Sequence, residues 1–352
     1  MKILASIFSI VYLCLIPINP NAQPNKIPET RRAPIAGELM DLTLQKDRYG
    51  IWPTENLTPG DTPWWFSKKL LQALYTSKGL WDGGIHTDGL LVLYKGKMIY
   101  EDYADGWDQS KPHAMHSITK SVVSALVGIA IGEGLIGSVQ DKVVDYFDDA
   151  VIPAGQESKN DMTIEHLLTM TSGILCETEE EWDGFFESQT DSALYAFLLP
   201  QKKAPGKKYM YDNVAPSILL GIIERAAKRD ALDYAQEKLF GPLGMTSVKW
   251  ETAADGLPFG GFGISMTPRD MARFGYLYLN YGRWEDKQII PGDYVARSRS
   301  RSINPSGYGY MFWNNESFPL SFTNAYEADG AYGQFISIYP FADMVVVRTG
   351  HE

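Results

Sequence analysis

Apolar positions change their spacing along the chain, and these changes predict the order of its elements. Residues 89–103 form two short apolar runs joined by Lys95-Gly96, which is typical of a β-hairpin whose sheet is covered on both faces. Apolar residues then recur at helical spacing from Ser117 to Ile136. Strand-like runs return only near the end of the chain, at residues 308–313, 334–339 and 344–348.

Helix signals dominate the region between these two sets of strands. Thr163 is placed to cap a helix that runs through Met170, and a second helix is predicted from Val214 to Ala227. Thr267, followed by a proline and by an acidic residue in the first turn, marks the start of a third helix. An acidic run at 177–181 is interpreted as a solvated loop.

The order of strands, helices and strands predicts an α+β fold in which both ends of the chain build one sheet. We expect residues 61–135 and 301–352 to form a discontinuous sheet domain, with a capped helix starting at Asp61. Residues 136–300 are expected to form an all-α domain inserted between them. Residues 23–60 are rich in Pro, Asn and Arg and are expected to form an extended N-terminal arm.

Residues 1–22 are predicted to be a secretory signal peptide. A short basic start precedes an apolar run at 3–18, and Ala22 offers a small residue at the cleavage point. A retained membrane anchor is the alternative, but the run is shorter than the roughly 20 residues of a spanning helix and is broken by Pro17. The mature protein is therefore expected to be soluble and exported, either periplasmic or secreted, with no stable membrane insertion.

The composition mainly excludes classes of protein and kinds of site. The chain has 352 residues, of which 45% are hydrophobic and 21% charged, a balance typical of globular proteins. Its formal net charge of -11 opposes binding to phosphate backbones, so no nucleic-acid partner is expected. With only 2 Cys and 5 His, neither a disulfide scaffold nor a Cys-rich zinc site is expected.

The first candidate for chemistry is Ser117-Ile118-Thr119-Lys120, at the start of a predicted helix. Residues three apart share a helix face, so the Lys120 amine can reach the Ser117 hydroxyl. A serine hydroxyl becomes a nucleophile when a base removes its proton, and burial can lower the pKa of a lysine enough for that role. The alternative is a solvated helix start with an exposed lysine, because this four-residue pattern alone is weak.

Tyr211 and Asn213 form the second candidate, just before the helix predicted from Val214. Two residues apart in an extended turn, both can point into one cleft. A phenol beside a lysine ammonium can lose its proton more easily and relay protons to a leaving group, and an amide can hold the lysine and a substrate carbonyl. The alternative is structural, with a packed tyrosine and with Asn213 as the cap of the helix.

The third candidate is the segment 328–334, which enters a predicted strand. Gly330 and Gly333 allow a ligand to approach the backbone closely. A strand-edge amide here could complete an oxyanion hole with the amide of Ser117. The same residues also fit a plain hairpin turn, and the two interpretations are compatible.

Taken together, the three motifs resemble those of the serine β-lactamase-like hydrolases. The closer likeness is to the class C branch, which includes esterases, D-aminopeptidase-like enzymes and 6-aminohexanoate-dimer hydrolases. The likeness runs from about Gly89 to the end of the chain, and the segment 328–334 is most similar to the 6-aminohexanoate-dimer group. The stretches that carry it are residues 116–136, 162–173, 267–275 and 328–334.

This resemblance implies a β-lactamase/transpeptidase-like fold, in which an antiparallel sheet of about five strands is flanked by helices and joined to a helical domain. It implies that Ser117 is the nucleophile, Lys120 its base partner, and Tyr211 the general base and later the acid. Asn213 would orient the substrate, and the amides of Ser117 and Ala331 would form the oxyanion hole. Attack would give an acyl-enzyme that water hydrolyses, with no metal and no organic cofactor.

Two departures from the family pattern bear on function. Ala328 stands where β-lactamases have a lysine and many esterases a histidine, so efficient hydrolysis of β-lactams is not expected unless Lys207 or Lys208 supplies the cation. The sequence also ends two residues after Gly350, where relatives usually continue into a helix, so either the chain is truncated or another segment covers that face of the sheet.

The favoured function is therefore a secreted serine hydrolase that cleaves a small ester, amide or peptide-like substrate. The alternative is a penicillin-binding-protein-like receptor or D,D-peptidase, or a β-lactamase, that is acylated by a peptide or a β-lactam. Loops such as 177–190 and 250–262 are expected to shape the substrate pocket.

Overall fold

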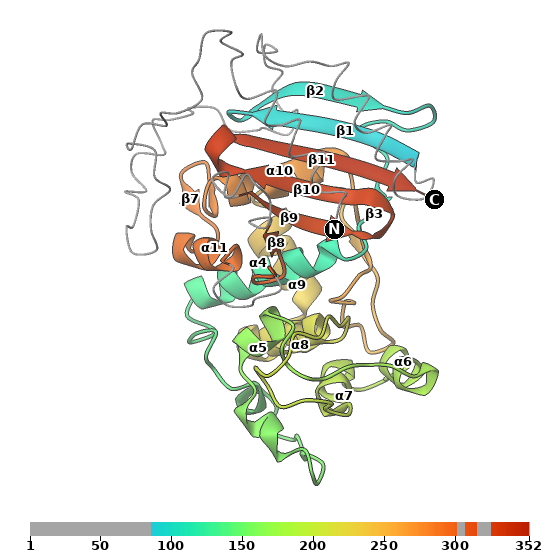
Figure 1. The fold of residues 1–352 in the computed structure, drawn as a ribbon, viewed down its shortest axis with the longest axis vertical. Helices are drawn as coiled ribbons and strands as arrows, with labels where there is room; N and C mark the ends of the chain where they lie inside the picture. The colour runs from blue at the N-terminus through green and yellow to red at the C-terminus, as the bar shows by residue number, and fades with distance from the viewer. Residues whose placement is uncertain (1–85, 301–306, 315–324, 352) are drawn as a thin grey trace, which may run out of the picture.

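The computed structural model describes residues 86–300, 307–314 and 325–351. The expected signal peptide, the N-terminal arm and the helix predicted from Asp61 lie outside these residues. Figure 1 shows one lobe built around a β-sheet and a second lobe of short helices and loops, with α4 (Ile118–Gly132) between them.

The main sheet is antiparallel and has six strands in the order β2-β1-β11-β10-β9-β8, where about five strands were expected. β1 pairs directly with β11, with Leu91 opposite Val347. This pairing confirms that both ends of the chain build one sheet. The strands are β1 (His86–Tyr94), β2 (Lys97–Tyr103), β8 (Trp313–Asn314), β9 (Tyr326–Gly330), β10 (Gln334–Tyr339) and β11 (Met344–His351).

The predicted hairpin at 89–103 is confirmed as β1 and β2. Its two turn residues, Lys95 and Gly96, both have positive φ (52° and 74°), as a two-residue hairpin turn that follows the strand twist requires. Alternate residues of β1 are buried on opposite faces of the sheet: Leu91 lies in the main core, whereas Leu90 lies in a second apolar cluster. The strand is thus buried on both faces, as its continuous apolar run predicted.

The strand predicted at 308–313 is wrong for most of its length. Tyr308 forms an isolated bridge with Trp313, so the chain turns back between them instead of extending. Met311 lies in this turn and has a left-handed φ of 58°. Only Trp313 and the next residue join the sheet, as β8.

Helix α10 (Pro268–Leu279) packs against the sheet. Thr267 accepts a hydrogen bond from the amide of Asp270, which confirms the predicted cap. Gly275 permits a close approach, because a Cβ there would lie 2.6 Å from Cγ1 of Val345 on β11. The region 136–300, expected to form a helical domain, therefore includes a helix that covers the sheet.

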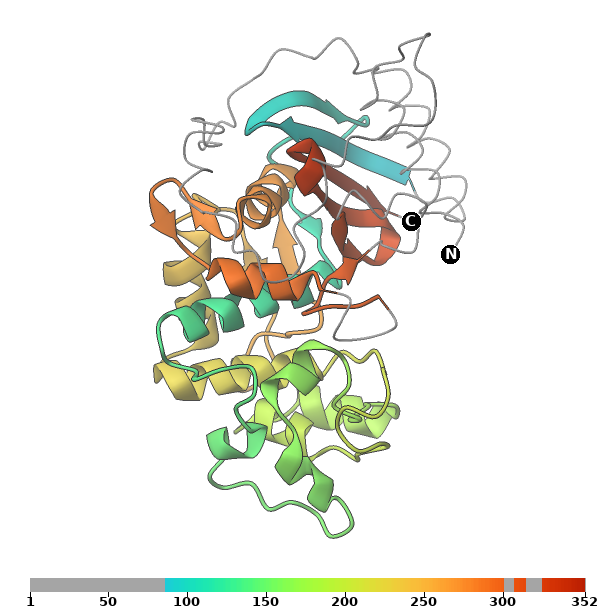
Figure 2. The same ribbon diagram turned by 60° about the vertical axis from the view of Figure 1, so that its left-hand side comes forward.

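The second lobe contains the other predicted helices (Figure 2). α5 (Ile164–Leu168) is capped by Thr163, and α8 (Ala215–Ala227) begins one residue after its predicted start.

No helix in the described part of the chain is long and apolar enough to cross a bilayer. The remaining α-helices and strands are α6 (Glu179–Phe186), α7 (Ser192–Leu198), α9 (Ala231–Ala235), α11 (Gly292–Ser298), β3 (His113–Ala114), β4 (Lys249–Trp250), β5 (Ile264–Met266), β6 (Arg283–Trp284) and β7 (Lys287–Gln288).

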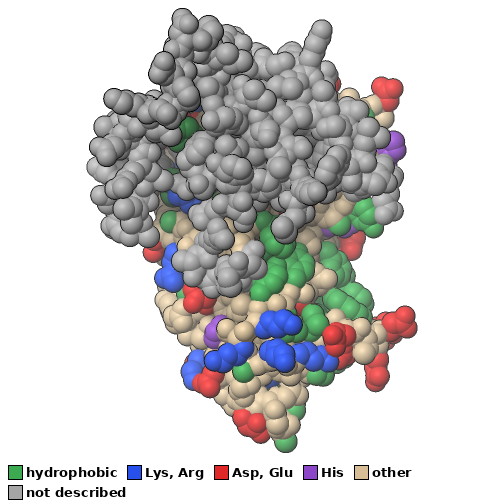
Figure 3. All heavy atoms as spheres, in the orientation of Figure 1, with side chains coloured by type: hydrophobic (Ala, Val, Ile, Leu, Met, Phe, Trp, Pro, Cys, Tyr) green, Lys and Arg blue, Asp and Glu red, His purple; other side chains and the backbone are tan. Residues whose placement is uncertain are grey.

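The acidic run at 177–181, expected to be a loop, instead starts helix α6. Thr178 accepts a hydrogen bond from the amide of Glu181, and the Glu181 carboxylate accepts one from the amide of Thr178. This reciprocal capping box, together with acidic residues in the first turn, stabilises a helix start. Figure 3 shows acidic side chains gathered at the edge of the lobe where Figure 1 places α6.

Candidate active site

Ser117 stands at a sharp turn between strand β3 and helix α4. The amide of Met115 donates to the carbonyl of Ile264 (2.7 Å), which ties this segment to β5. His116 then takes a left-handed φ of 48°, a conformation that is uncommon outside glycine. The turn leaves Ser117 half-buried at the N-terminal end of α4.

The Lys120 amine is the centre of the polar network in the site. Its side chain is 0% exposed, which excludes the interpretation of Lys120 as a solvated residue. Nζ lies 3.0 Å from Ser117 Oγ and donates to Asn213 Oδ1 (2.7 Å) and to the carbonyl of Gly261 (2.7 Å). Burial lowers the pKa of Lys120 to about 7. The negative charge of Asp212 raises this pKa, but its effect is smaller than that of burial. An unprotonated Lys120 can keep both other bonds and direct its lone pair at the Ser117 hydroxyl.

Tyr211 lies on the other side of this pair. Its phenol is hydrogen-bonded with Ser117, and its ring centre lies 4.8 Å from Lys120 Nζ. Burial raises the pKa of Tyr211 to about 12 and outweighs the hydrogen bond with Ser117, which lowers it. The expectation that a lysine ammonium eases loss of the phenolic proton is therefore wrong for this site. Tyr211 is a neutral proton donor near pH 7, and Lys120 is better matched to the role of base.

The structure separates two roles that the sequence left open for the segment before α8. Asp212, not Asn213, satisfies the helix start: its Oδ1 accepts from the amides of Val214 (2.9 Å) and Ala215 (2.7 Å). The interpretation of Asn213 as a cap is therefore wrong, and its side chain is free to bind Lys120.

Two residues of the site were missed from the sequence. Gly261 supplies the carbonyl that holds Lys120. It also lies close to Asn213, because a Cβ at Gly261 would be 2.4 Å from the backbone carbonyl oxygen of Asn213. Asp212 is buried next to Asn213, and its Oδ2 has no hydrogen-bond partner within the described structure. Burial raises the pKa of Asp212 to about 6. No sequence signal marks Gly261, whereas a helix-capping Asp at 212 was available from the pattern.

The charge of Asp212 leads to a prediction for the pH dependence of activity. Ionised Asp212 raises the pKa of Lys120, so Asp212→Asn is expected to move the acid limb of kcat/KM to lower pH. An asparagine oxygen can still accept the hydrogen bonds from Val214 and Ala215. The measurement is the pH profile of kcat/KM for a neutral ester. Asp191→Asn changes a carboxylate that caps α7 and leaves the profile in place; an unshifted profile for Asp212→Asn would contradict the coupling.

The segment expected to supply the second oxyanion-hole amide lies beside Ser117. Gly330, the last residue of β9, packs so tightly that a Cβ there would be 2.2 Å from the carbonyl oxygen of Met115. Ala331 follows at the exposed start of the turn between β9 and β10. The amides proposed for the oxyanion hole therefore belong to two adjoining segments.

The position that carries a cation in β-lactamases is apolar here. Ala328 is fully buried in β9. The side chains of Lys207 and Lys208, considered as replacements, are exposed. Across the described ranges, no group of three or more His, Cys, Asp or Glu side chains is arranged to hold a metal ion.

Comparison with known proteins extends this picture. The β-lactamase family model matches residues 69–349. The chain is 24% identical over 304 residues to the 6-aminohexanoate-dimer hydrolase of Paenarthrobacter ureafaciens, across 74% of this chain and 72% of that protein. Its fold is similar to that of a Bacteroides dorei DSM 17855 protein provisionally described as a β-lactamase, with a TM-score of 0.69 and 19% identity over 81% of this chain and 91% of that one. It is also similar to the octameric penicillin-binding protein homologue of Pyrococcus abyssi, with a TM-score of 0.64 and 19% identity over 80% and 73% of the two chains.

The β-lactamase/transpeptidase-like fold and these relatives define a serine hydrolase of the amidase or esterase type. With the match extending over most of its length, the chain belongs to the β-lactamase family. The family and the α+β fold predicted from the motifs are thereby confirmed.

Proposed function

We propose that the protein is an exported hydrolase that cleaves a small ester or amide through an acyl-enzyme on Ser117, with Lys120 and Tyr211 completing the catalytic set. The observation that carries this proposal is the 3.0 Å contact between Ser117 Oγ and the amine of a fully buried lysine. Because burial lowers the pKa of Lys120 to about 7, a large fraction of the amine is unprotonated near neutral pH. Export rests on the apolar segment at residues 3–18 and its basic start.

The contacts support a sequence of proton transfers. Unprotonated Lys120 takes the proton of Ser117 as Oγ bonds to the substrate carbonyl carbon, and the amides of Ser117 and Ala331 stabilise the oxyanion. The Tyr211 phenol gives its proton to the departing alcohol or amine, and the proton held by Lys120 restores the phenol. Water then attacks the acyl-enzyme, and the proton transfers run in the opposite direction. The Tyr211 phenol passes its proton to Lys120 as it takes one from the water, and Lys120 gives its proton to the departing Ser117 oxygen. The acid is released and the Ser117 hydroxyl is regenerated. Asn213 and the Gly261 carbonyl hold Lys120 in place throughout.

The two segments expected to shape the pocket, one of which forms helix α6, support an apolar substrate group. The ring of Phe262 lies 6.4 Å from that of Trp182, 6.2 Å from that of Phe186 and 5.3 Å from that of Phe259, measured between ring centroids. Phe262 directly follows Gly261, whose carbonyl binds Lys120, so this aromatic group lies near the reacting atoms. Aromatic rings favour aliphatic or aromatic acyl and alcohol groups. The buried Ala328 offers no cation for the carboxylate of a β-lactam.

Fluorophosphonate labelling combined with turnover assays tests the function. We expect the probe to modify Ser117, identified by peptide mass spectrometry, and to abolish hydrolysis of p-nitrophenyl butyrate in a one-to-one ratio. A panel of esters, linear amides and a chromogenic cephalosporin then separates the activities. Labelling without turnover of any substrate would identify a receptor, and preferred cleavage of the cephalosporin a β-lactamase. Absence of labelling would overturn the acyl-enzyme mechanism.

A further inference from the structure

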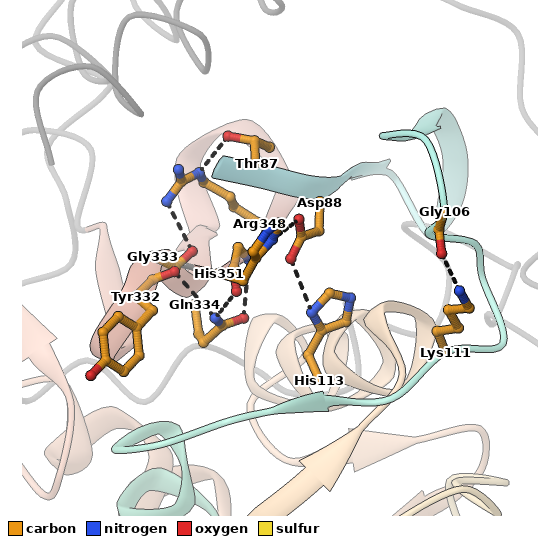
Figure 4. Close-up of polar contacts among 11 residues, drawn as sticks. Thr87, Asp88, Gly106, Lys111, His113, Tyr332, Gly333, Gln334, Arg348 and His351 are labelled. Atoms are coloured by element: carbon orange, nitrogen blue, oxygen red, sulfur yellow. Dashed lines mark hydrogen bonds and ion pairs between the residues drawn. The ribbon is translucent and has the colours of Figure 1, made fainter. Parts of the chain in front are cut away.

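The turn that carries the proposed oxyanion donor has an unusual backbone. Ala331 is followed by Tyr332 and Gly333, which both have left-handed φ values (59° and 77°). This conformation is unfavourable for a tyrosine, so the surrounding structure must hold it. Two carbonyl groups of this turn, those of Tyr332 and Gly333, are bound by two buried side chains (Figure 4).

Gln334 holds the first carbonyl. Its side-chain amide donates to the oxygen of Tyr332 (3.2 Å) and to that of Gly350 on β11 (2.6 Å), while its Oε1 accepts from the amide of Gly350 (3.3 Å). Gln334 is 1% exposed. Gln334 thus joins the turn to the adjacent strand through a side chain that is buried away from water.

Arg348 holds the second carbonyl. Its Nη1 donates to the oxygen of Gly333 (3.1 Å), and its Nε donates to Thr87 Oγ1 on β1 (3.0 Å). Arg348 is 0% exposed, and a Cβ at position 333 would lie 1.7 Å from its Nη1. Glycine at 333 is therefore required by the guanidinium as well as by the left-handed backbone.

We infer that Gln334 and Arg348 are positioning residues that hold the 331–333 turn so that the Ala331 amide faces the developing oxyanion. The inference rests on the proposed acyl-transfer function. Stabilisation of an oxyanion depends on donors that are fixed before charge develops, and loss of one such donor typically lowers kcat by about 10²- to 10³-fold. A donor that is displaced but still present should lose part of that effect. The side chains act through backbone carbonyls and touch no reacting atom.

The test compares Gln334→Met and Arg348→Lys with wild type. Methionine retains the length of the glutamine side chain without its donors, and lysine retains the charge of Arg348 without its two-pronged geometry. For p-nitrophenyl butyrate we expect kcat to fall about 10- to 100-fold with KM changed less than about 2-fold, because the interaction forms in the transition state. The Ki of phenylboronic acid, which forms a tetrahedral adduct with a serine, should rise by a similar factor.

Ser337→Ala is the matched control. Ser337 is buried on the same strand, β10, and its hydroxyl donates to Glu327 on β9, away from the turn. We expect this variant to lose thermal stability but to keep kcat and the Ki. Unchanged kcat in both test variants, or a fall matched by Ser337→Ala at equal loss of stability, would overturn the inference while wild-type turnover upholds the proposed function. A wild-type protein that is neither labelled nor active would instead overturn the function itself.

Discussion

Ser117→Ala is expected to lower kcat/KM for p-nitrophenyl butyrate by about 10³- to 10⁶-fold, because it removes the hydroxyl proposed to form the acyl-enzyme. The residual rate above that of water would come from substrate binding and the oxyanion hole. Ser117 is half-buried and lies outside the apolar core, so we expect the variant to remain folded. The measurements are steady-state kinetics, fluorophosphonate labelling and circular dichroism of the same preparations.

Ser121→Ala provides the control on the same helix. Ser121 lies one turn further along α4, and its buried hydroxyl donates to the carbonyl of Met311 (2.6 Å). Its loss should cost about 1 kcal/mol of stability and leave turnover unchanged. If Ser117→Ala kept the wild-type rate, or if Ser121→Ala lost it equally, Ser117 would not be the nucleophile.

The parts of the fold that followed from the sequence are those that local patterns determine. The β1–β2 hairpin has a turn whose residues accept positive φ, and Thr267 is followed by a proline and by the Asp270 amide that its side chain caps. Helix α6 was also readable, since Thr178 and Glu181 have the spacing of a capping box. Its acidic composition favours a loop, and that prediction is wrong because the capping box at this spacing stabilises a helix start.

The missed parts of the site depend on contacts between distant segments. Gly261 reaches Lys120 across 141 positions of the chain, and nothing near either residue indicates this pairing. The direction in which the pKa of Tyr211 shifts could not be predicted from the sequence either, because it depends on how completely the folded lobes exclude water from the phenol. Two motifs could be predicted as parts of a site because each lies next to the start of a predicted helix. They are the pair Ser117 and Lys120 and the pair Tyr211 and Asn213.

Lys120→Met is expected to lower kcat/KM by about 10²- to 10⁴-fold, the usual contribution of a general base. In wild type, the pKa of about 7 predicts that kcat/KM rises with pH through that value as the amine loses its proton. The variant should lack this rise. Lys159→Met is the matched control: Lys159 is likewise 0% exposed, and its amine donates to the carbonyls of Phe197 and Leu199 in the helical lobe, so its loss should leave the pH profile intact.

Lys120 should also change how the free energy of unfolding depends on pH, which can be measured independently of activity. Burial lowers the pKa of Lys120 from 10.5 to about 7, so between these values the unfolded chain binds a proton that the folded chain lacks. Lys120 therefore makes the free energy of unfolding increase with pH from about 7 to about 10.5. Below pH 7 the cost of burying the protonated amine destabilises the folded state in full. Urea unfolding at several pH values should show a smaller increase for Lys120→Met than for wild type. Equal increases for the two proteins would show that Lys120 remains protonated in the folded state, and the proposed base would then have to be another group.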